Sequence, residues 1–345
     1  MKVALVIGRC PPGTCGTGDY AALLSDALRA RGVDARLIVS EDWRVRGVWK
    51  VRESLRAYDV VHIVYPTLGF GYNLGPQVLS LLQGCVISIQ EASQRRILRK
   101  LSLLPFLVRP KHVIFNSEFE RQYVTRWAPW TAARSSLIPA PANIRAFPEK
   151  RPRFANEVVH FGLIVPHKGL EDVIELSRLI RSEGLTWKVR IIGGLAPERM
   201  EYFQKLKAET AALPVIWDVN RCEEEVAERL ASSAVAYFPF PDGASERRSS
   251  FKAALANGVA VVTTSGAHTT EAMKTFQKFA ETPREALGAI HSLLQNPPER
   301  DRLARNAADF LLTWERSAEL HAAIYRRLLC SGQRPAIDVK DAQRE

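Results

Sequence analysis

The stretch that decides the fold runs Tyr237-Phe-Pro-Phe-Pro-Asp-Gly-Ala-Ser-Glu-Arg-Arg-Ser-Ser-Phe-Lys-Ala-Ala-Leu-Ala-Asn-Gly258 and continues into Val259-Ala-Val-Val-Thr-Thr-Ser-Gly266. An apolar run over 234–238 predicts a buried strand, which the following prolines and Asp-Gly turn bring to an end. A helical pattern over 249–257 then stops at a glycine, as helices commonly do. The order strand, polar loop, helix, strand is one unit of a doubly wound parallel sheet, so it predicts an α/β fold.

The polar loop of this stretch is the first candidate binding site. It follows a predicted parallel strand at its carboxyl end, which is where open α/β sheets bind ligands. Arg247 and Arg248 stand just before the free backbone N–H groups of Ser249 and Ser250, so the loop can hold an anion. We interpret it as a phosphate and sugar pocket in which Glu246 faces the sugar. A solvated helix start with two surface arginines is the alternative.

The bulk composition leaves room for two domains. The chain has 345 residues, of which 46% are hydrophobic, enough for two sizeable cores. Its five cysteines are scattered and odd in number, which is typical of reduced thiols, and no His or Cys cluster predicts a metal site. The sequence shows neither a spanning apolar run nor a signal peptide, so we expect a cytoplasmic protein.

The formal charge of +11 is concentrated in one segment. Between positions 91 and 153 there are thirteen Arg and Lys against four Glu. Over 92–111 the cations alternate with leucines, which is typical of a helix lying on an anionic membrane surface, here the inner face. An ordinary surface helix packed on its sheet explains the pattern equally well. Nucleic-acid binding is not expected, because the segment lacks interleaved aromatic residues for base stacking.

Proline and charge density near position 150 predict a linker between two Rossmann-like domains. We place the first domain over 1–150 and the second over 151–330, with a polar tail over 331–345. The last predicted helix covers 298–329.

A glycine-rich loop follows the first predicted strand. Gly16 and Gly18 have no side chain, so a phosphate or sugar can approach the backbone closely. Read as Gly16-x-Gly18-x-x-Ala21, with Glu41 or Asp42 after the next strand, the same residues fit a loose NAD-binding pattern. Seven residues separate the strand from the glycines, which a tight dinucleotide turn does not tolerate well.

The next strands of the first domain supply residues that would line a cleft. Tyr65 ends a buried strand over 60–65, and Gln90 and Glu91 follow the strand after it. The carboxyl ends of parallel strands share one edge of a sheet, so these residues are candidates for the acceptor side. His62, inside the first of these strands, is interpreted as a core histidine.

The segment from Pro239 to Thr264 resembles the donor-site segment of family-4 glycosyltransferases of the GT-B fold, and the likeness continues over most of the chain. The resemblance implies two Rossmann-like domains facing across a cleft, with the last helix crossing back to the first domain. It also implies retaining, metal-independent transfer of a hexose from a nucleotide-diphosphate sugar, with no other cofactor. The acceptor would be a glycan or a lipid-linked sugar in polysaccharide or glycolipid biosynthesis.

The resemblance also assigns roles to single residues. Lys168 matches a lysine that grips the donor diphosphate, while Leu163 stands where the family has an arginine. The glycine-rich loop matches the loop that lines the diphosphate and the acceptor, and Gln90 takes the place of a histidine. Ser245 and Ala253 occupy the positions of two family glutamates.

The chemistry of sugar transfer fits these residue types. Negative charge develops on the leaving phosphate, and fixed cations with helix N-termini can neutralise it. Lys168, Arg247 and Arg248, with amides near Ser249 and Gly266, provide such a set, and Glu246 is the candidate for the sugar cation. An NAD-dependent oxidoreductase and a catalytically silent GT-B binding partner are the alternatives; the altered motif positions suggest the second.

Overall fold

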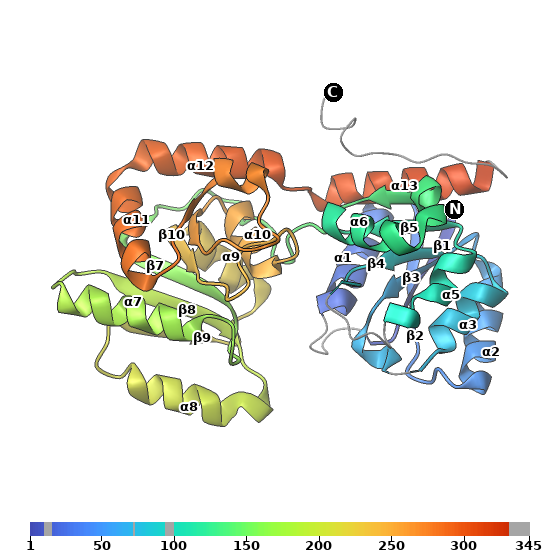
Figure 1. The fold of residues 1–345 in the computed structure, drawn as a ribbon, viewed down its shortest axis with the longest axis horizontal. Helices are drawn as coiled ribbons and strands as arrows, with labels where there is room; N and C mark the ends of the chain where they lie inside the picture. Colours follow the sequence, from blue (N-terminus) through green and yellow to red (C-terminus); the bar gives the residue numbers. More distant parts are fainter. Residues whose placement is uncertain (10–15, 72, 94–99, 331–345) are drawn as a thin grey trace. The chain divides into compact units, whose positions relative to one another are not determined.

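The computed structural model describes residues 1–9, 16–71, 73–93 and 100–330 of the chain (Figure 1). It divides into two compact units: Met1–Pro141 together with the segment from Leu312 onward, and Ala142–Leu311. Each unit contains one parallel six-stranded sheet covered by helices, which is the predicted α/β architecture.

The sheet of the first unit has the strand order β2-β1-β3-β4-β5-β6. Its register pairs Val3 of β1 with Ala35 of β2 and with Val60 of β3, all in parallel. Parallel strands are buried on both faces and therefore read as nearly continuous apolar runs, as β1, β3 and β4 of this sheet do. The strands are β1 Lys2–Ile7, β2 Asp34–Val39, β3 Val60–Tyr65, β4 Val86–Ile89, β5 His112–Phe115 and β6 Ser135–Leu137.

Helices cover both faces of this sheet. One core lies under α1 and α13, and the other lies under α2, α3, α5 and α6. Ser117 Oγ accepts a hydrogen bond from the Glu120 N–H at 3.3 Å and so caps α6. The helices are α1 Gly16–Ala30, α2 Val45–Ser54, α3 Gly75–Leu82, α5 Leu104–Val108, α6 Glu118–Trp127 and α13 Trp314–Cys330, with short 3₁₀ turns at Leu55–Ala57, Leu68–Phe70 and Pro129–Arg134.

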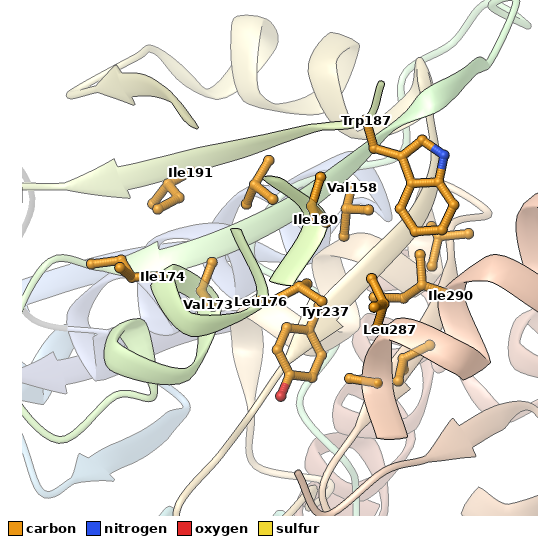
Figure 2. Packing of buried hydrophobic residues seen from close by; sticks show 14 of the residues in the cluster. Val158, Val173, Ile174, Leu176, Ile180, Trp187, Ile191, Tyr237, Leu287 and Ile290 are labelled. Carbon is orange, nitrogen blue, oxygen red and sulfur yellow. The ribbon is translucent and has the colours of Figure 1, made fainter. Parts of the chain in front are cut away.

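The second unit repeats the plan with strand order β12-β11-β10-β7-β8-β9. Figure 2 shows one of its two cores, in which side chains from α7 and α11 meet side chains from the sheet. The other core lies against α9 and α10. The strands are β7 Phe154–Leu163, β8 Lys188–Gly194, β9 Val215–Val219, β10 Ser233–Phe238, β11 Ala260–Thr263 and β12 Gln277–Phe279. The helices are α7 Leu170–Ser182, α8 Met200–Glu209, α9 Glu223–Ala231, α10 Ser249–Ala256, α11 Pro283–Gln295 and α12 Pro297–Phe310, with 3₁₀ turns at Pro197–Arg199 and Glu271–Thr275.

The helix predicted over 298–329 is wrong in one respect, because the structure breaks it into α12 and α13. Thr313 Oγ1 accepts a hydrogen bond from the Arg316 N–H at 3.2 Å, so this threonine starts a new helix. The break is where the chain leaves the second unit, and α13 packs against α1 in the first unit.

A buried polar cluster links α13 to the sheet of the first unit. His62 is fully buried, as predicted; its Nδ1 lies 2.6 Å from the Tyr325 hydroxyl and its Nε2 lies 2.8 Å from Ser88 Oγ. The Tyr20 hydroxyl of α1 lies 3.3 Å from His321 Nε2 of α13. Burial lowers the pKa of His321 to about 4, so the cluster is built from neutral rings.

Candidate functional site

The loop that joins β10 to α10 is called the donor loop here and comprises residues 239–248. It packs tightly against the segment that follows β11. A Cβ on Gly243 would overlap the backbone at Gly266, and the Ala244 N–H donates to Thr264 O at 3.0 Å. Thr269 Oγ1 donates to Ala244 O at 2.9 Å and accepts from the Gly266 N–H at 3.0 Å. The structure therefore brings the predicted residue Gly266 beside the loop that carries Glu246.

The start of α10 keeps its amides available. Within the described chain, no side chain caps this helix, and the first-turn N–H groups at Ser249 and Ser250 lack intrahelical partners by geometry. Arg248 is turned toward its own loop, where its guanidinium pairs with Asp242 and lies 4.5 Å from the centre of the Phe240 ring. Arg248 thus fastens the loop, while Arg247 beside it is half-buried.

The loop carrying Lys168 adjoins the donor loop. Gly169 has a φ of +82° and starts α7, and a Cβ there would overlap the carbonyl oxygen of Pro239. Lys168 is exposed at this junction, and Leu163, at the position where an arginine is expected, is 57% exposed. The two predicted cation-bearing loops of the second unit therefore meet at the carboxyl end of its sheet.

Lys252 is a functional candidate that the sequence analysis missed. It lies on α10 and is only 5% exposed, although it is a lysine. Burial lowers the pKa of its ammonium to about 8, and the nearby Glu246 carboxylate acts in the opposite direction. The signal was available, since Lys252 is the one polar residue in the stretch from Phe251 to Ala256.

Gly16 and Gly18, the two glycines of the predicted glycine-rich loop, belong to the first unit. The structure starts α1 at Gly16, so both glycines lie in the first turn of this helix. Gly18 is buried in the first helical turn, and burial raises the pKa of Asp19 next to it. The preceding positions 10–15 lie outside the described residues.

The candidates from β3 and β4 come together. The Gln90 N–H donates to Tyr65 O at 2.9 Å, and the Asn116 amide donates to Gln90 Oε1 at 3.0 Å. Tyr65 is buried, with its ring centre 4.9 Å from that of Phe106, whereas Gln90 and Glu91 are half-buried. Of these three residues, Gln90 and Glu91 present surface at the carboxyl end of the sheet.

Glu120 of α6 fixes the chain that follows these residues. One of its carboxylate oxygens accepts the N–H groups of Ala92 at 2.9 Å and Ser93 at 3.0 Å. The other accepts the Ser93 hydroxyl at 2.6 Å. Glu120 is fully buried, so this carboxylate replaces the water that the turn would otherwise bind.

A polar cavity of about 380 Å³ lies beside the end of β2 in the first unit. Arg9 Nε lies 3.8 Å from a Glu41 carboxylate oxygen at its margin. The cavity lining combines carboxylates, an amide, an indole and a guanidinium, from Glu41, Asp42, Trp43, Arg44 and Asn73.

The described residues contain neither a metal-binding cluster nor a membrane-spanning helix. No group of three or more His, Cys, Asp or Glu in this part of the chain is placed to hold a metal ion. None of the helices over the same residues combines the length and the apolar character needed to cross a bilayer.

The structure describes the segment 92–111, which is predicted to lie on a membrane surface, except for positions 94–99. Its described part contains the short helix α5. Leu101, Leu104 and Val108 are exposed there, together with Arg109 and Lys111.

No family model and no curated protein sequence matches the chain. Among solved structures, Anabaena HepE in complex with UDP and glucose is similar with a TM-score of 0.70 and 14% identity, covering 94% of this chain and 98% of that one. Sucrose-phosphate synthase from Thermosynechococcus elongatus is similar with a TM-score of 0.68 and 16% identity, covering 96% of this chain and 99% of that one. AviGT4, a glycosyltransferase involved in avilamycin A biosynthesis, has a TM-score of 0.62 and 19% identity, covering 96% of this chain and 98% of that one. Together with the two parallel sheets, these likenesses show that the chain has the two-domain α/β architecture of the GT-B fold.

Proposed function

We propose that the chain transfers a hexose from a nucleotide-diphosphate sugar to a glycan or lipid-linked acceptor, as a divergent, retaining member of the family-4 glycosyltransferases. The observation that carries the proposal is the meeting of the Lys168 loop, the donor loop and the Gly266 segment at one edge of the second sheet. UDP is the first nucleotide to test, because HepE was solved with UDP and with UDP-glucose and has the same fold.

The residues at this edge have distinct parts in the proposed mechanism. Departure of the nucleotide leaves negative charge on its phosphates, which the exposed Lys168 and the free amides at the start of α10 can neutralise. Arg247 is the second candidate cation, whereas Arg248 holds the loop in shape through Asp242. Glu246 would face the positive charge that develops on the sugar ring.

We propose that Gln90 and Glu91 contact the acceptor and that Tyr65, which is buried, supports them from the core. Gly16 and Gly18 are proposed to let the donor or the acceptor approach the backbone at the start of α1. Charge neutralisation by fixed protein groups makes the proposed reaction independent of a metal ion.

A ligand screen tests this function. The full-length protein is heated with UDP, GDP, ADP, their sugars, or NAD(H), and released nucleotide is measured in parallel. At a ligand concentration of about 100 Kd the folded state gains about 2.7 kcal/mol, which raises Tm by several degrees. A shift with a nucleotide sugar and release of its nucleotide support the proposal. A shift with NAD(H) alone would instead favour the oxidoreductase, and a nucleotide shift without hydrolysis or transfer would favour the silent partner.

Peripheral binding to an anionic membrane is a second proposal, supported by the exposed Leu101, Leu104 and Val108 beside Arg109 and Lys111. A protein that acts on a lipid-linked acceptor from the cytoplasmic side would need such a face. Co-sedimentation with phosphatidylglycerol-containing vesicles should exceed that with pure phosphatidylcholine and should fall when Leu101 and Val108 are both changed to Glu. Equal sedimentation with both kinds of vesicle would contradict it.

A further inference from the structure

None of the residues that line the polar cavity beside the end of β2 has a part in the proposed function. The cavity volume of about 380 Å³ falls within the range of about 300–1,000 Å³ that is typical of small-molecule sites. One wall is the segment 41–44, which follows β2, and the other is Asn73, which precedes α3. The carboxyl ends of parallel strands share one edge of a sheet, so the cavity lies at the same edge as Gln90 and Glu91.

The two walls of the cavity are fixed to each other. Trp43 is only 2% exposed, its Nε1 donates to Ser40 O at 2.6 Å, and its ring centre lies 5.0 Å from that of Phe70. A Cβ on Gly75 would overlap the carbonyl oxygen of Trp43, so the backbone two residues after Asn73 touches the opposite wall. Walls that hold their shape in this way lower the entropic cost of binding a ligand.

The charges in and beside the cavity are balanced. The lining carries the carboxylates of Glu41 and Asp42 and the guanidinium of Arg44. Arg9 Nε lies 3.8 Å from a Glu41 carboxylate oxygen, so two negative groups meet two positive ones, which favours a neutral ligand. The carboxylates accept hydrogen bonds, whereas the guanidiniums and the Asn73 amide donate them, so the hydroxyl groups of a sugar find both kinds of partner. None of the described lining residues has an aliphatic side chain, so a lipid tail has no apolar surface to cover.

The strand order sets how far this cavity lies from the other acceptor residues. In the order β2-β1-β3-β4, the ends of β2 and β4 are three strand spacings apart, which is about 14 Å. We propose that the cavity is an acceptor subsite for a neutral sugar, and that the acceptor is an oligosaccharide reaching from Gln90 to this cavity. A single sugar ring is too short to contact both places. The inference rests on the proposed function, because an acceptor is required only if a sugar is transferred.

Binding to a printed glycan array tests the class of ligand without any donor. The array carries single sugars together with neutral, acidic and amino-sugar oligosaccharides. The full-length protein should bind neutral oligosaccharides, and the matching single sugars at least about tenfold more weakly. The double variant Glu41→Leu/Asn73→Leu should lose at least about tenfold in affinity, which corresponds to one hydrogen bond to a charged group. Glu53→Leu is the matched control and should bind within about 2-fold of the natural protein, because Glu53 is a similarly exposed carboxylate of the same unit that also pairs with an arginine.

Steady-state kinetics with the oligosaccharide that binds best test whether the cavity serves the acceptor. The double variant should raise KM for this oligosaccharide at least about tenfold and change kcat less than about 3-fold, because the cavity lies three strands from Gln90. The gain in Tm that UDP gives should be the same in the double variant and in the natural protein, since the donor residues are unchanged.

The possible outcomes separate this subsite from the proposed function. Binding to acidic oligosaccharides alone, binding to none, or equal binding by the double variant overturns the subsite. Binding of NAD(H) that the double variant loses would assign the cavity to a ribose and would overturn it as well. If no nucleotide sugar is turned over but neutral oligosaccharides bind through the cavity, the sugar site stands and the proposed function fails. If transfer proceeds with an unchanged KM in the double variant, the proposed function stands and the subsite fails.

Discussion

Gly169 offers the sharpest test of how the two loops of the candidate site fit together. A substitution by alanine meets two separate penalties. The first is conformational, because a φ of +82° is a left-handed backbone that costs an L-residue about 1–2 kcal/mol. The second is steric, because the new Cβ would overlap the carbonyl oxygen of Pro239, and overpacking of this kind costs about 1–3 kcal/mol. Together Gly169→Ala should destabilise the second unit by about 2–5 kcal/mol.

Gly184 is a matched control just past the other end of the same helix. Its φ of +66° carries the same conformational penalty, but among the described residues no atom lies within 4 Å of a Cβ placed there. Gly184→Ala should therefore cost only about 1–2 kcal/mol. The difference between the two variants measures the contact between the loops.

Thermal unfolding followed by circular dichroism measures both variants. For a unit of this size, 1 kcal/mol corresponds to about 2–4 °C in Tm, so Gly169→Ala should melt several degrees below Gly184→Ala. The same change should weaken UDP binding, because it pushes the Lys168 loop away from the donor loop. Equal losses of Tm in the two variants would refute the reasoning that these loops touch.

Three further perturbations test other parts of the structure. Arg190 pairs with Glu157 at 2.8 and 2.9 Å and with Asp218 at 2.6 Å, and all three side chains are nearly buried. Arg190→Met should therefore lower the free energy of unfolding, measured in urea, by about 3–5 kcal/mol. Lys188→Met, at an exposed position of the same strand, should lower it by less than about 0.5 kcal/mol. Glu120→Ala leaves two backbone N–H groups without their acceptor, so hydrogen exchange should speed up over 92–93, and unchanged protection there would disprove the role of this carboxylate. The pKa of His321 is about 4 when folded and near 6.5 when unfolded, so the unfolded chain binds more protons between these values. Stability should hence be lost as the pH falls from about 6.5 to 4, and His321→Gln should flatten that decline.

The fold was predictable because its signals are local. The strand, loop and helix around the donor loop appear where the apolar run, the prolines and the glycine stop placed them, with β10 ending at Phe238 and α10 beginning at Ser249. Each of these signals needs only a few neighbouring residues.

The details of the site depend on long-range packing and were less accessible. Nothing in a local pattern says that Arg248 pairs with Asp242 rather than facing a ligand, or that Glu120 reaches back to a turn 28 residues earlier. Lys252 was overlooked for a related reason, since a lysine in a helix is expected to be exposed. The break at Thr313 also escaped detection, because the helical pattern continues on both sides of a threonine that begins a new helix.

The return of the last helix to the first unit has a consequence for biosynthesis. Residues 142–311 are contiguous, so the ribosome delivers all strands of the second sheet before the first unit receives α13. Until then, the face of α1 that α13 covers stays exposed, and the apolar side chains of Tyr20 and Leu24 lack part of their packing. Residues 142–311 can therefore fold before the first unit is complete. A nascent or prematurely terminated polypeptide would expose this apolar surface of the first unit, to which chaperones bind and through which chains aggregate.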